Sequence, residues 1–166
     1  ILLGAPQPSL TLAQEMGVAD EVIDVLSVSA EERIARVLAL TEHGVGADVV
    51  FETAGVPSAF IEGLEMLRKM GTFAEVGNLI DTGATAQLNI ARLITSKAVN
   101  LFGVVSQPPQ TMVKALKTME ITGKRFDYKR LVTAQFNVTE ALDAVRLAQD
   151  PVEKGIKIVL RGAGFQ

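Results

Sequence analysis

The sequence contains no cysteine and a single histidine, His43. Disulfides and thiolate metal sites are therefore excluded, and one histidine cannot supply the usual ligands of a zinc site. His43 lies at an expected helix end before a glycine loop, where a cation suits the helix dipole, so we assign it no catalytic role. We expect no metal site within these 166 residues.

A basic surplus and long hydrophobic runs are also missing. The 16 Lys and Arg residues face 19 Asp and Glu residues, for a net charge of -3 and no block of like charges. This balance does not favour a nucleic acid or an anionic membrane as a partner. No apolar run approaches the roughly 20 residues of a membrane span, and the first residues lack the features of a signal peptide. We expect a cytoplasmic protein.

The residues that are present, 48% hydrophobic and 21% charged, suffice for one globular domain with a sizeable core. Short apolar runs alternate with helical periodicity, and Gly, Pro or Asp marks each switch. Strands are predicted at 1–4, 21–25, 48–54, 71–78 and 100–105, and helices at 9–17, 29–43, 57–69, 88–95 and 109–122. This alternation is typical of an α/β fold with a doubly wound parallel sheet.

The last 40 or so residues follow as a smaller α/β tail. A strand is predicted near 131–136, a helix at 139–149 and a final strand at 156–160. The helix places Ala141, Leu142 and Val145 on one face, which needs another apolar surface to cover it.

Small residues follow several of the predicted strands. In open parallel sheets, ligands bind beyond the carboxyl ends of the strands. These ends carry Gly4, the segments 53–55 and 77–79, and the segment from Val104 to Ser106. A turn requirement can explain each glycine alone, whereas a flat ligand along the sheet edge better explains the series. Dinucleotide cofactors are the common ligand of that shape.

Two carboxylates, Glu52 and Glu75, also fall near strand ends. They fit either an acid/base pair or hydrogen-bonded structural groups near the crevice. Because the sequence supplies no accompanying nucleophile or sugar site, we favour the structural role. Tyr128 and Lys124 have the wrong order and spacing for a tyrosine–lysine reductase pair.

Three stretches carry a family resemblance: GADVVFETAGVPSAFIEGLEMLRKMGTFAEVGNL, NLFGVV, and LVTAQFNVTEALDAVRLAQDPVEKGIKIVL. In this order they resemble the C-terminal portion of the medium-chain dehydrogenase/reductase family. The loop GNLIDTGATAQLN is similar to that of the zinc-dependent alcohol, polyol and threonine dehydrogenase branch. The resemblance covers essentially the whole chain. It implies a Rossmann-like dinucleotide-binding domain at 1–125 and a segment at 126–166 that in the family packs on the catalytic domain.

In the family, a first Rossmann strand with its GxGxxG loop precedes a stretch similar to ILLGAPQPSLTLAQEMG, and a zinc-bearing catalytic domain precedes both. The resemblance therefore implies that the chain is a fragment without these regions. The family's first strand lies between the strands at 1–4 and 48–54. Its loss would expose two strand edges that invite pairing with another chain.

The resemblance also suggests roles for the predicted site residues. One group resembles the wall beside the cofactor's ribose: Thr53, Ala54 and Gly55. A second group resembles the backbone segment that meets the nicotinamide carboxamide: Gly77, Asn78 and Leu79. Val104 and Ser106 match its other contact. Lys157 matches a basic residue that faces the ribose-phosphate portion, although a solvated tail lysine explains it equally well.

Cofactor choice stays open between NAD and NADP. Gly4 stands where an Asp or Glu would accept hydrogen bonds from the adenosine ribose, and no arginine follows to hold a 2′-phosphate. The resemblance implies the cofactor-binding region of an NAD(P)-dependent alcohol or polyol dehydrogenase, with zinc confined to the absent catalytic domain. This chain then contains no catalytic residue, and we expect it to be inactive alone.

Two alternatives remain. The chain could serve as a catalytically inactive assembly module, or as a nucleotide-binding regulator that retains the crevice without the chemistry. The strand at 100–105 resembles the edge through which family dimers pair, so a homodimer is expected under the enzyme and assembly interpretations alike.

Overall fold

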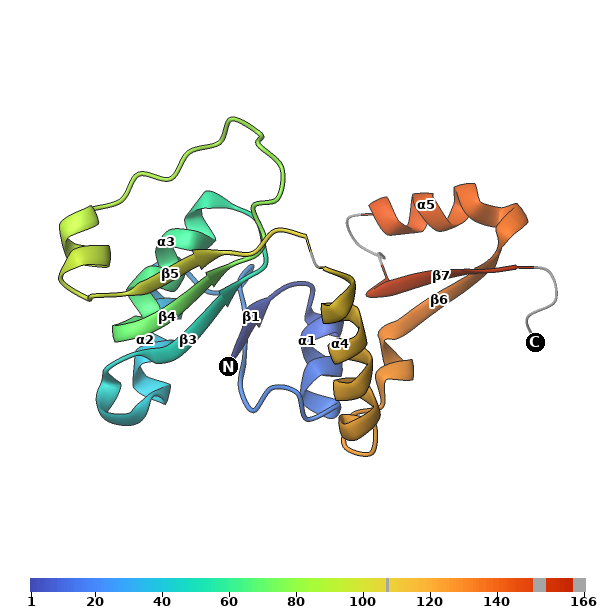
Figure 1. The fold of residues 1–166 in the computed structure, drawn as a ribbon, viewed down its shortest axis with the longest axis horizontal. Coiled ribbons are helices and arrows are strands. Elements are labelled where there is room, and N and C mark those ends of the chain that lie inside the picture. Colours follow the sequence, from blue (N-terminus) through green and yellow to red (C-terminus); the bar gives the residue numbers. More distant parts are fainter. Residues whose placement is uncertain (107, 151–154, 163–166) are drawn as a thin grey trace. The chain divides into compact units, whose positions relative to one another are not determined.

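The computed structural model describes residues 1–106, 108–150 and 155–162. The chain forms two compact units. Unit 1 comprises Ile1–Gly4 and Val22–Pro108, and unit 2 comprises Ala5–Glu21 and the chain from Pro109 onward (Figure 1). Within the described ranges, no helix is long and apolar enough to cross a membrane. The domain boundary expected after residue 125 stays a prediction.

Unit 1 contains five strands, and every pairing between them is parallel. β1 (Leu2–Gly4) pairs with β2 (Val22–Asp24), and a second sheet has the order β3 (Ala47–Glu52), β4 (Leu67–Glu75) and β5 (Asn100–Gly103). The parallel α/β prediction is thus confirmed. The two sheets are separate in the described structure, and β1 is not paired with β3. This division falls where the family resemblance places a further strand.

The core of unit 1 lies between the three-stranded sheet and α3 (Pro57–Met66) (Figure 1). Leu64 of α3 and Phe73 of β4 are completely buried in it, together with Leu67 and Leu93. The ring of Phe60 meets that of Phe73 edge to face, with 5.0 Å between the centroids. This apolar contact fixes the position of α3 against the strands whose ends carry the candidate site.

The second helix, α2 (Ala30–Leu40), begins at the predicted cap, where the Ser29 hydroxyl accepts a hydrogen bond from the amide of Glu32. It ends three residues earlier than predicted. The Thr41 hydroxyl donates to the carbonyl of Leu38 and accepts from the amide of Gly46, and these two bonds replace the next helical turn. Of the predicted helix at 88–95, one short helical turn forms, at Ala91–Thr95.

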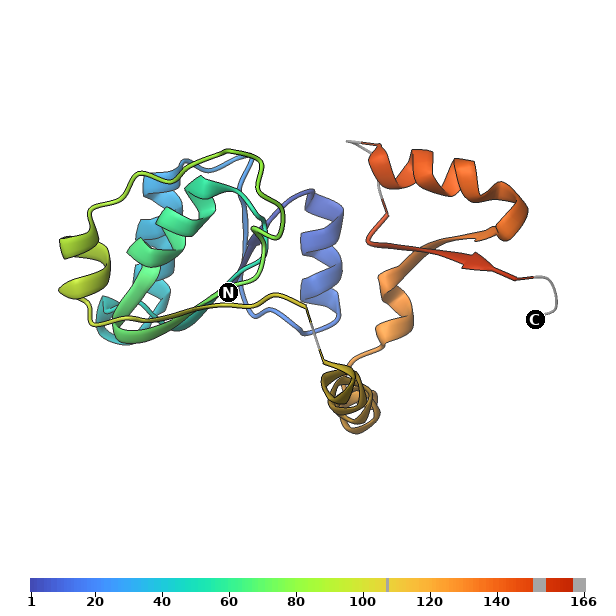
Figure 2. The same ribbon diagram turned by 45° about the horizontal axis from the view of Figure 1, so that its top comes forward.

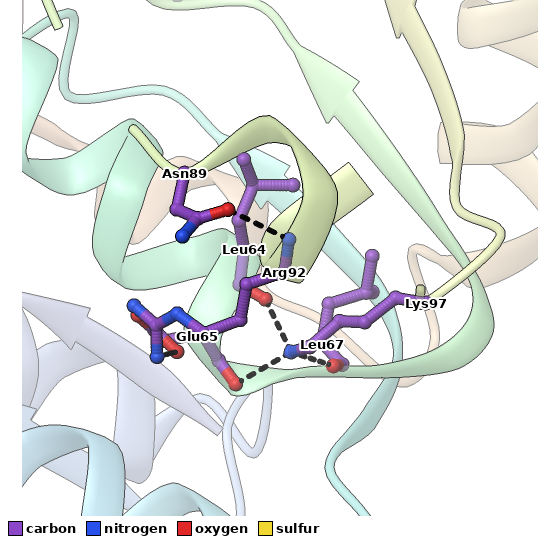
Figure 3. A network of polar contacts seen from close by, with 6 residues as sticks. All are labelled: Leu64, Glu65, Leu67, Asn89, Arg92 and Lys97. Atoms are coloured by element: carbon purple, nitrogen blue, oxygen red, sulfur yellow. Dashed lines mark hydrogen bonds and ion pairs between the residues drawn. The ribbon is translucent and has the colours of Figure 1, made fainter. Parts of the chain in front are cut away.

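The boundary between α3 and β4 also differs from the prediction. The helix predicted at 57–69 ends at Met66, and the strand predicted at 71–78 begins at Leu67 and ends at Glu75. A distant lysine binds the chain at this boundary. The Lys97 ammonium donates to the carbonyl oxygens of Leu64 at 2.6 Å and Leu67 at 2.7 Å, and to that of Glu65 at 3.0 Å (Figure 3).

Figure 3 shows that Lys97 reaches the carbonyl end of α3 from the chain after the 91–95 turn. The last carbonyls of a helix have no helical partner, so an ammonium group there both satisfies them and complements the helix dipole. Burial lowers the pKa of Lys97 from its ordinary value. In the same network, Arg92 pairs with Glu65 and donates its amide to the Asn89 side chain.

Unit 2 contains α1 (Gln7–Glu15) and α4 (Pro109–Thr122), followed by β6 (Val132–Asn137), α5 (Ala141–Gln149) and β7 (Lys157–Arg161). β6 and β7 are parallel, and α5 lies across one face of the pair (Figure 2). Asn137 and Glu140 form a capping box before α5. The strand, helix and strand predicted for the tail are therefore confirmed, with small shifts of their ends.

Candidate functional site

The candidate site lies at the carboxyl ends of the three paired strands of unit 1. Glu52 of β3 is in register with Glu75 of β4, which is in register with Gly103 of β5. The segments that follow these residues therefore leave the sheet at one common edge. This edge brings together eight of the ten predicted site residues: Thr53, Ala54, Gly55, Gly77, Asn78, Leu79, Val104 and Ser106.

The other two predicted residues lie elsewhere. Gly4 ends β1, in the two-stranded sheet of unit 1, and its carbonyl accepts a hydrogen bond from the amide of Val25 at 3.0 Å. Lys157 begins β7 in unit 2. Its proposed contact with the phosphate portion of a cofactor stays a prediction.

The loops after β3 and β4 meet backbone to backbone at Gly55 and Gly77. Gly55 has a φ of 71°, in the left-handed region that favours glycine. A Cβ atom on Gly55 would lie 2.6 Å from the carbonyl oxygen of Gly77, and one on Gly77 would overlap the amide nitrogen of Gly55. Both positions therefore require glycine for the loops to come this close.

Glu52 holds both of these loops. Its side-chain Oε1 accepts hydrogen bonds from the amides of Ala54 at 2.7 Å and Gly55 at 3.0 Å. Its main-chain carbonyl accepts from the amides of Val76 at 2.9 Å and Gly77 at 3.0 Å. Glu52 is 4% exposed, and among the described residues it is the one acidic or basic residue that is buried. These hydrogen bonds agree with the structural role predicted for Glu52, and that role stays a prediction.

Glu75 has the same role at the end of the neighbouring strand, β4. Its Oε1 accepts from the main-chain amide of Asn78 at 3.0 Å and from the Asn78 side-chain amide at 2.9 Å. Its carbonyl accepts from the amide of Val104 at 2.8 Å. The two glutamates thus connect all three segments that form the edge.

Glu52, Glu75 and the Gly55 and Gly77 loops that they bind form a junction, and the carboxyl group of Glu52 has a shifted pKa there. Burial raises the pKa of Glu52 above its ordinary value, and the neighbouring Glu75 side chain raises it further. The amides of Gly55 and Ala54 act in the opposite direction. The second carboxyl oxygen of Glu75, Oε2, is buried and accepts no hydrogen bond in the described structure.

A cleft of about 390 Å³ opens beside this junction. The first turn of α3 contributes Pro57 and Phe60, and the loop after β4 contributes residues from Asn78 to Ala86. Glu75 lies in its wall. The cleft therefore combines an aromatic ring with polar groups next to the strand ends.

A second cavity, of about 510 Å³, lies within unit 2. Leu12 and Ala13 of α1 and Met16, which follows that helix, line it together with Leu131 and the ring of Tyr128. The Tyr128 hydroxyl is engaged with the Thr122 hydroxyl at 2.6 Å. This lining is mostly apolar, so it offers little to orient a polar cofactor.

The glycines of the edge were predicted from the sequence, but the number of contacts made by the two glutamates was not. A signal for this was present: Glu52 and Glu75 each end an apolar strand and precede a glycine by two or three residues. A carboxylate at such a position can accept hydrogen bonds from the amides of its own turn. Lys97 was missed entirely, because its partners lie about 30 residues away in the sequence.

Comparisons with known proteins agree with this geometry. Residues 5–121 match the family model described as "Zinc-binding dehydrogenase". Sorbitol dehydrogenase from Halalkalibacterium halodurans is 33% identical over 138 residues, which cover 83% of this chain and 37% of that protein. The chain therefore spans well under half the length of this relative.

Solved structures share the fold. An alcohol dehydrogenase from Thermotoga maritima superimposes with a TM-score of 0.86 at 24% identity, over 97% of this chain and 42% of that one. A short chain alcohol dehydrogenase from E. coli CFT073, complexed with the cofactor NADH, has a TM-score of 0.76 at 18% identity, over 96% of this chain and 43% of that one. At these identities the likeness establishes the Rossmann-like α/β fold.

Proposed function

Because this chain belongs to the zinc-binding dehydrogenase family, within the medium-chain dehydrogenases, we propose that it is the cofactor-binding region of an NAD(P)-dependent alcohol or polyol dehydrogenase. The observation that carries the proposal is the common edge of β3, β4 and β5, where the Gly55 and Gly77 loops meet. The sorbitol dehydrogenase relative favours a polyol or a related alcohol as the substrate of the whole enzyme.

The chemistry of the edge fits the nicotinamide and ribose groups of a nicotinamide dinucleotide. The segments 53–55, 76–79 and 104–106 contain no Lys or Arg and carry short polar side chains at Thr53 and Ser106. Glycine lets a flat ring approach the main chain, whose amides and carbonyls can bind a carboxamide and a ribose. The diphosphate needs a basic partner, for which Lys157 is our candidate.

When bound, the nicotinamide ring accepts or donates the hydride. The role of this chain is to hold that ring in place. Glu52 and Glu75 keep their carboxyl groups turned into the junction, where they bind amides of the loops rather than facing the ring. Thr53, Asn78 and Ser106 are then the side chains left at the surface of the edge. A fixed surface of this kind orients the ring toward a substrate held by other regions of the enzyme.

Zinc is a different case. Among the residues that the structure describes, no group of three or more His, Cys, Asp or Glu side chains could hold a metal ion. We propose, as the family resemblance implies, that the zinc ligands of the family belong to its catalytic domain. The cytoplasmic location and the inactivity of the chain alone also stay predictions.

We further propose that two copies pair through β5. This strand is the edge of its sheet, and it presents Leu101 and Phe102 to solvent, with Val105 just beyond it. An exposed apolar edge strand favours pairing with a second chain. Pairing alone would also suit an assembly module, so cofactor binding is what separates the two functions.

A fluorescence titration of the chain with NADH and with NADPH tests the main proposal. Saturable binding of one of them supports it and identifies the preferred cofactor. Failure of both to bind at millimolar concentration would contradict it and leave assembly as the activity of this chain.

A further inference from the structure

The hydrogen bonds around Glu52 and Glu75 are unevenly distributed. In both side chains the short bonds go to Oε1, at 2.7 and 3.0 Å for Glu52 and at 2.9 and 3.0 Å for Glu75. The Oε2 of Glu52 receives longer contacts, at 3.3 Å from the amide of Gly55 and at 3.4 Å from the side chain of Asn78. The Oε2 of Glu75 is buried and receives none.

The two side chains are neighbours, because Glu52 and Glu75 are in register on adjacent strands and the side-chain amide of Asn78 reaches Glu52 Oε2 at 3.4 Å and Glu75 Oε1 at 2.9 Å. Neighbouring carboxyl groups can form a hydrogen bond with each other when they share a proton. Two ionised carboxylates can only accept hydrogen bonds, so such a bond requires a proton on one of them. That proton would also provide the missing partner for the buried Oε2 of Glu75. The geometry and the unpaired atom therefore call for the same proton.

Among the described residues of unit 1, the elements packed around the pair offer it no free positive charge. The charged residues of α3, Glu62 and Glu65, pair with Arg33 and Arg92. β5 carries no titratable side chain. Asp81 lines the adjoining cleft and adds negative charge. Glu52 is buried and Glu75 is half-buried, and two adjacent carboxylates in such a site without a cation cannot both ionise at ordinary cost.

We propose that Glu52 and Glu75 share one proton and that this protonated pair positions the Gly55 and Gly77 loops for the cofactor. The role in cofactor binding rests on the proposed function, whereas the shared proton does not. Glu52 and Glu75 are positioning residues, because their carboxyl groups bind the loops.

Loss of the proton should loosen the junction. A second negative charge would push the ends of β3 and β4 apart by electrostatic repulsion. This would separate Gly55 from Gly77, whose main chains are in direct contact. Because the pKa of Glu52 in the folded chain is raised, the folded chain binds more protons than the unfolded chain above pH 4.5, the ordinary value of this carboxyl. The free energy of unfolding therefore falls as the pH rises from 4.5 to the raised pKa, and is constant above it.

Glu75→Gln tests the proposal without changing the shape of the side chain. The Gln amide oxygen can still accept from Asn78, and its NH₂ group donates permanently toward Glu52, as the shared proton would. Asp81→Asn is the matched control, since it removes one negative charge from the same cleft but not from the pair. Urea unfolding of the wild type and both variants is measured from pH 4.5 to 9.

The wild type and Asp81→Asn are expected to lose urea resistance as the pH rises through the titration of the pair, and Glu75→Gln is expected to show no such loss. Carbon NMR of ¹³C-labelled Glu side chains should show one carboxyl of the pair titrating well above pH 4.5. The proposal of a shared proton would be overturned if urea resistance had the same pH dependence in Glu75→Gln and the wild type. It would also be overturned if both carboxyl groups titrated at the ordinary pH of a glutamate.

NADH titrations of the same three proteins between pH 5 and 9 test the positioning role. Affinity should weaken with rising pH in the wild type and Asp81→Asn and stay constant in Glu75→Gln. Binding with the same pH profile in all three would overturn the positioning role. A wild type that binds neither NADH nor NADPH would overturn the proposed function and with it the positioning role. The urea and NMR results would still show whether Glu52 and Glu75 share a proton.

Discussion

The main chains of Gly55 and Gly77 lie in direct contact, although 22 residues and an entire helix separate them in the sequence. The contact joins the end of β3 to the end of β4 and leaves no room for a side chain on either residue. Glu52 accepts hydrogen bonds from the amides of both glycines, one through its carboxyl group and the other through its carbonyl. The candidate site is therefore organised around a contact that any added methyl group would break.

Gly77→Ala is expected to lower the free energy of unfolding by about 1–3 kcal/mol, the usual cost of overpacking. The new Cβ would lie 2.5 Å from Glu52 Oε2 and would overlap the Gly55 amide nitrogen. Gly103→Ala is the control at the end of the neighbouring strand, because no atom lies within 4 Å of its Cβ position. Urea denaturation compares the two, and equal losses would show that the Gly55–Gly77 contact is looser than described.

Lys97→Met should destabilise the chain by about 1–3 kcal/mol, because a thioether cannot satisfy the carbonyls at the end of α3. The methionine keeps the length and apolar stem of the lysine, so the loss reports the three hydrogen bonds of its ammonium. Lys117→Met, on the exposed surface of α4, is the matched control. If both variants unfold at the same urea concentration, the proposed cap does not stabilise α3.

Arg33→Met is expected to cost about 3 kcal/mol, because it leaves the Glu62 carboxylate unpaired in a largely buried position. Arg33 bonds both Glu62 oxygens, at 2.7 and 2.9 Å, and the two side chains are 13% and 16% exposed. Arg36→Met, on the same helix, removes a half-exposed pair with Glu32 and should cost no more than about 1 kcal/mol. Thermal or urea unfolding gives the comparison. Similar losses in the two variants would argue against a structural role for the Arg33–Glu62 pair.

Phe102→Lys tests the proposed dimer. The side chain is half exposed on β5, so a charge there should fold normally but oppose pairing of two edges. Sedimentation velocity is expected to show a dimer for the wild type and a monomer for the variant. A wild type that sediments as a monomer at all concentrations would contradict the dimer directly.

Several features were predictable from the sequence because their causes are local. The cap at Ser29, the order of strands and helices, and the glycines after β3 and β4 all follow from patterns within a few residues. The end of α3 was not predictable in this way. Residues 67–69 continue a plausible helix, and Lys97, which binds the carbonyls at the end of α3, is distant in the sequence.

The junction of Glu52 and Glu75 illustrates the same limit at the candidate site. The sequence places both residues near strand ends and favours a hydrogen-bonded structural role for each. Their mutual contact depends on the register of β3 against β4, which becomes known when the strands are paired. The buried, unpaired Oε2 of Glu75 is a consequence of that register and of the close approach of the Gly55 and Gly77 loops.

The central claim, that the edge of β3, β4 and β5 receives a nicotinamide cofactor, is tested most directly by amide NMR of the ¹⁵N-labelled chain during titration with NADH and NADPH. The proposed site predicts saturable shifts of the amides of residues 53–55, 76–79 and 104–106, and smaller changes near Leu12 and Tyr128, which line the other cavity. Shifts confined to that second cavity, or no shifts with either cofactor, would contradict it.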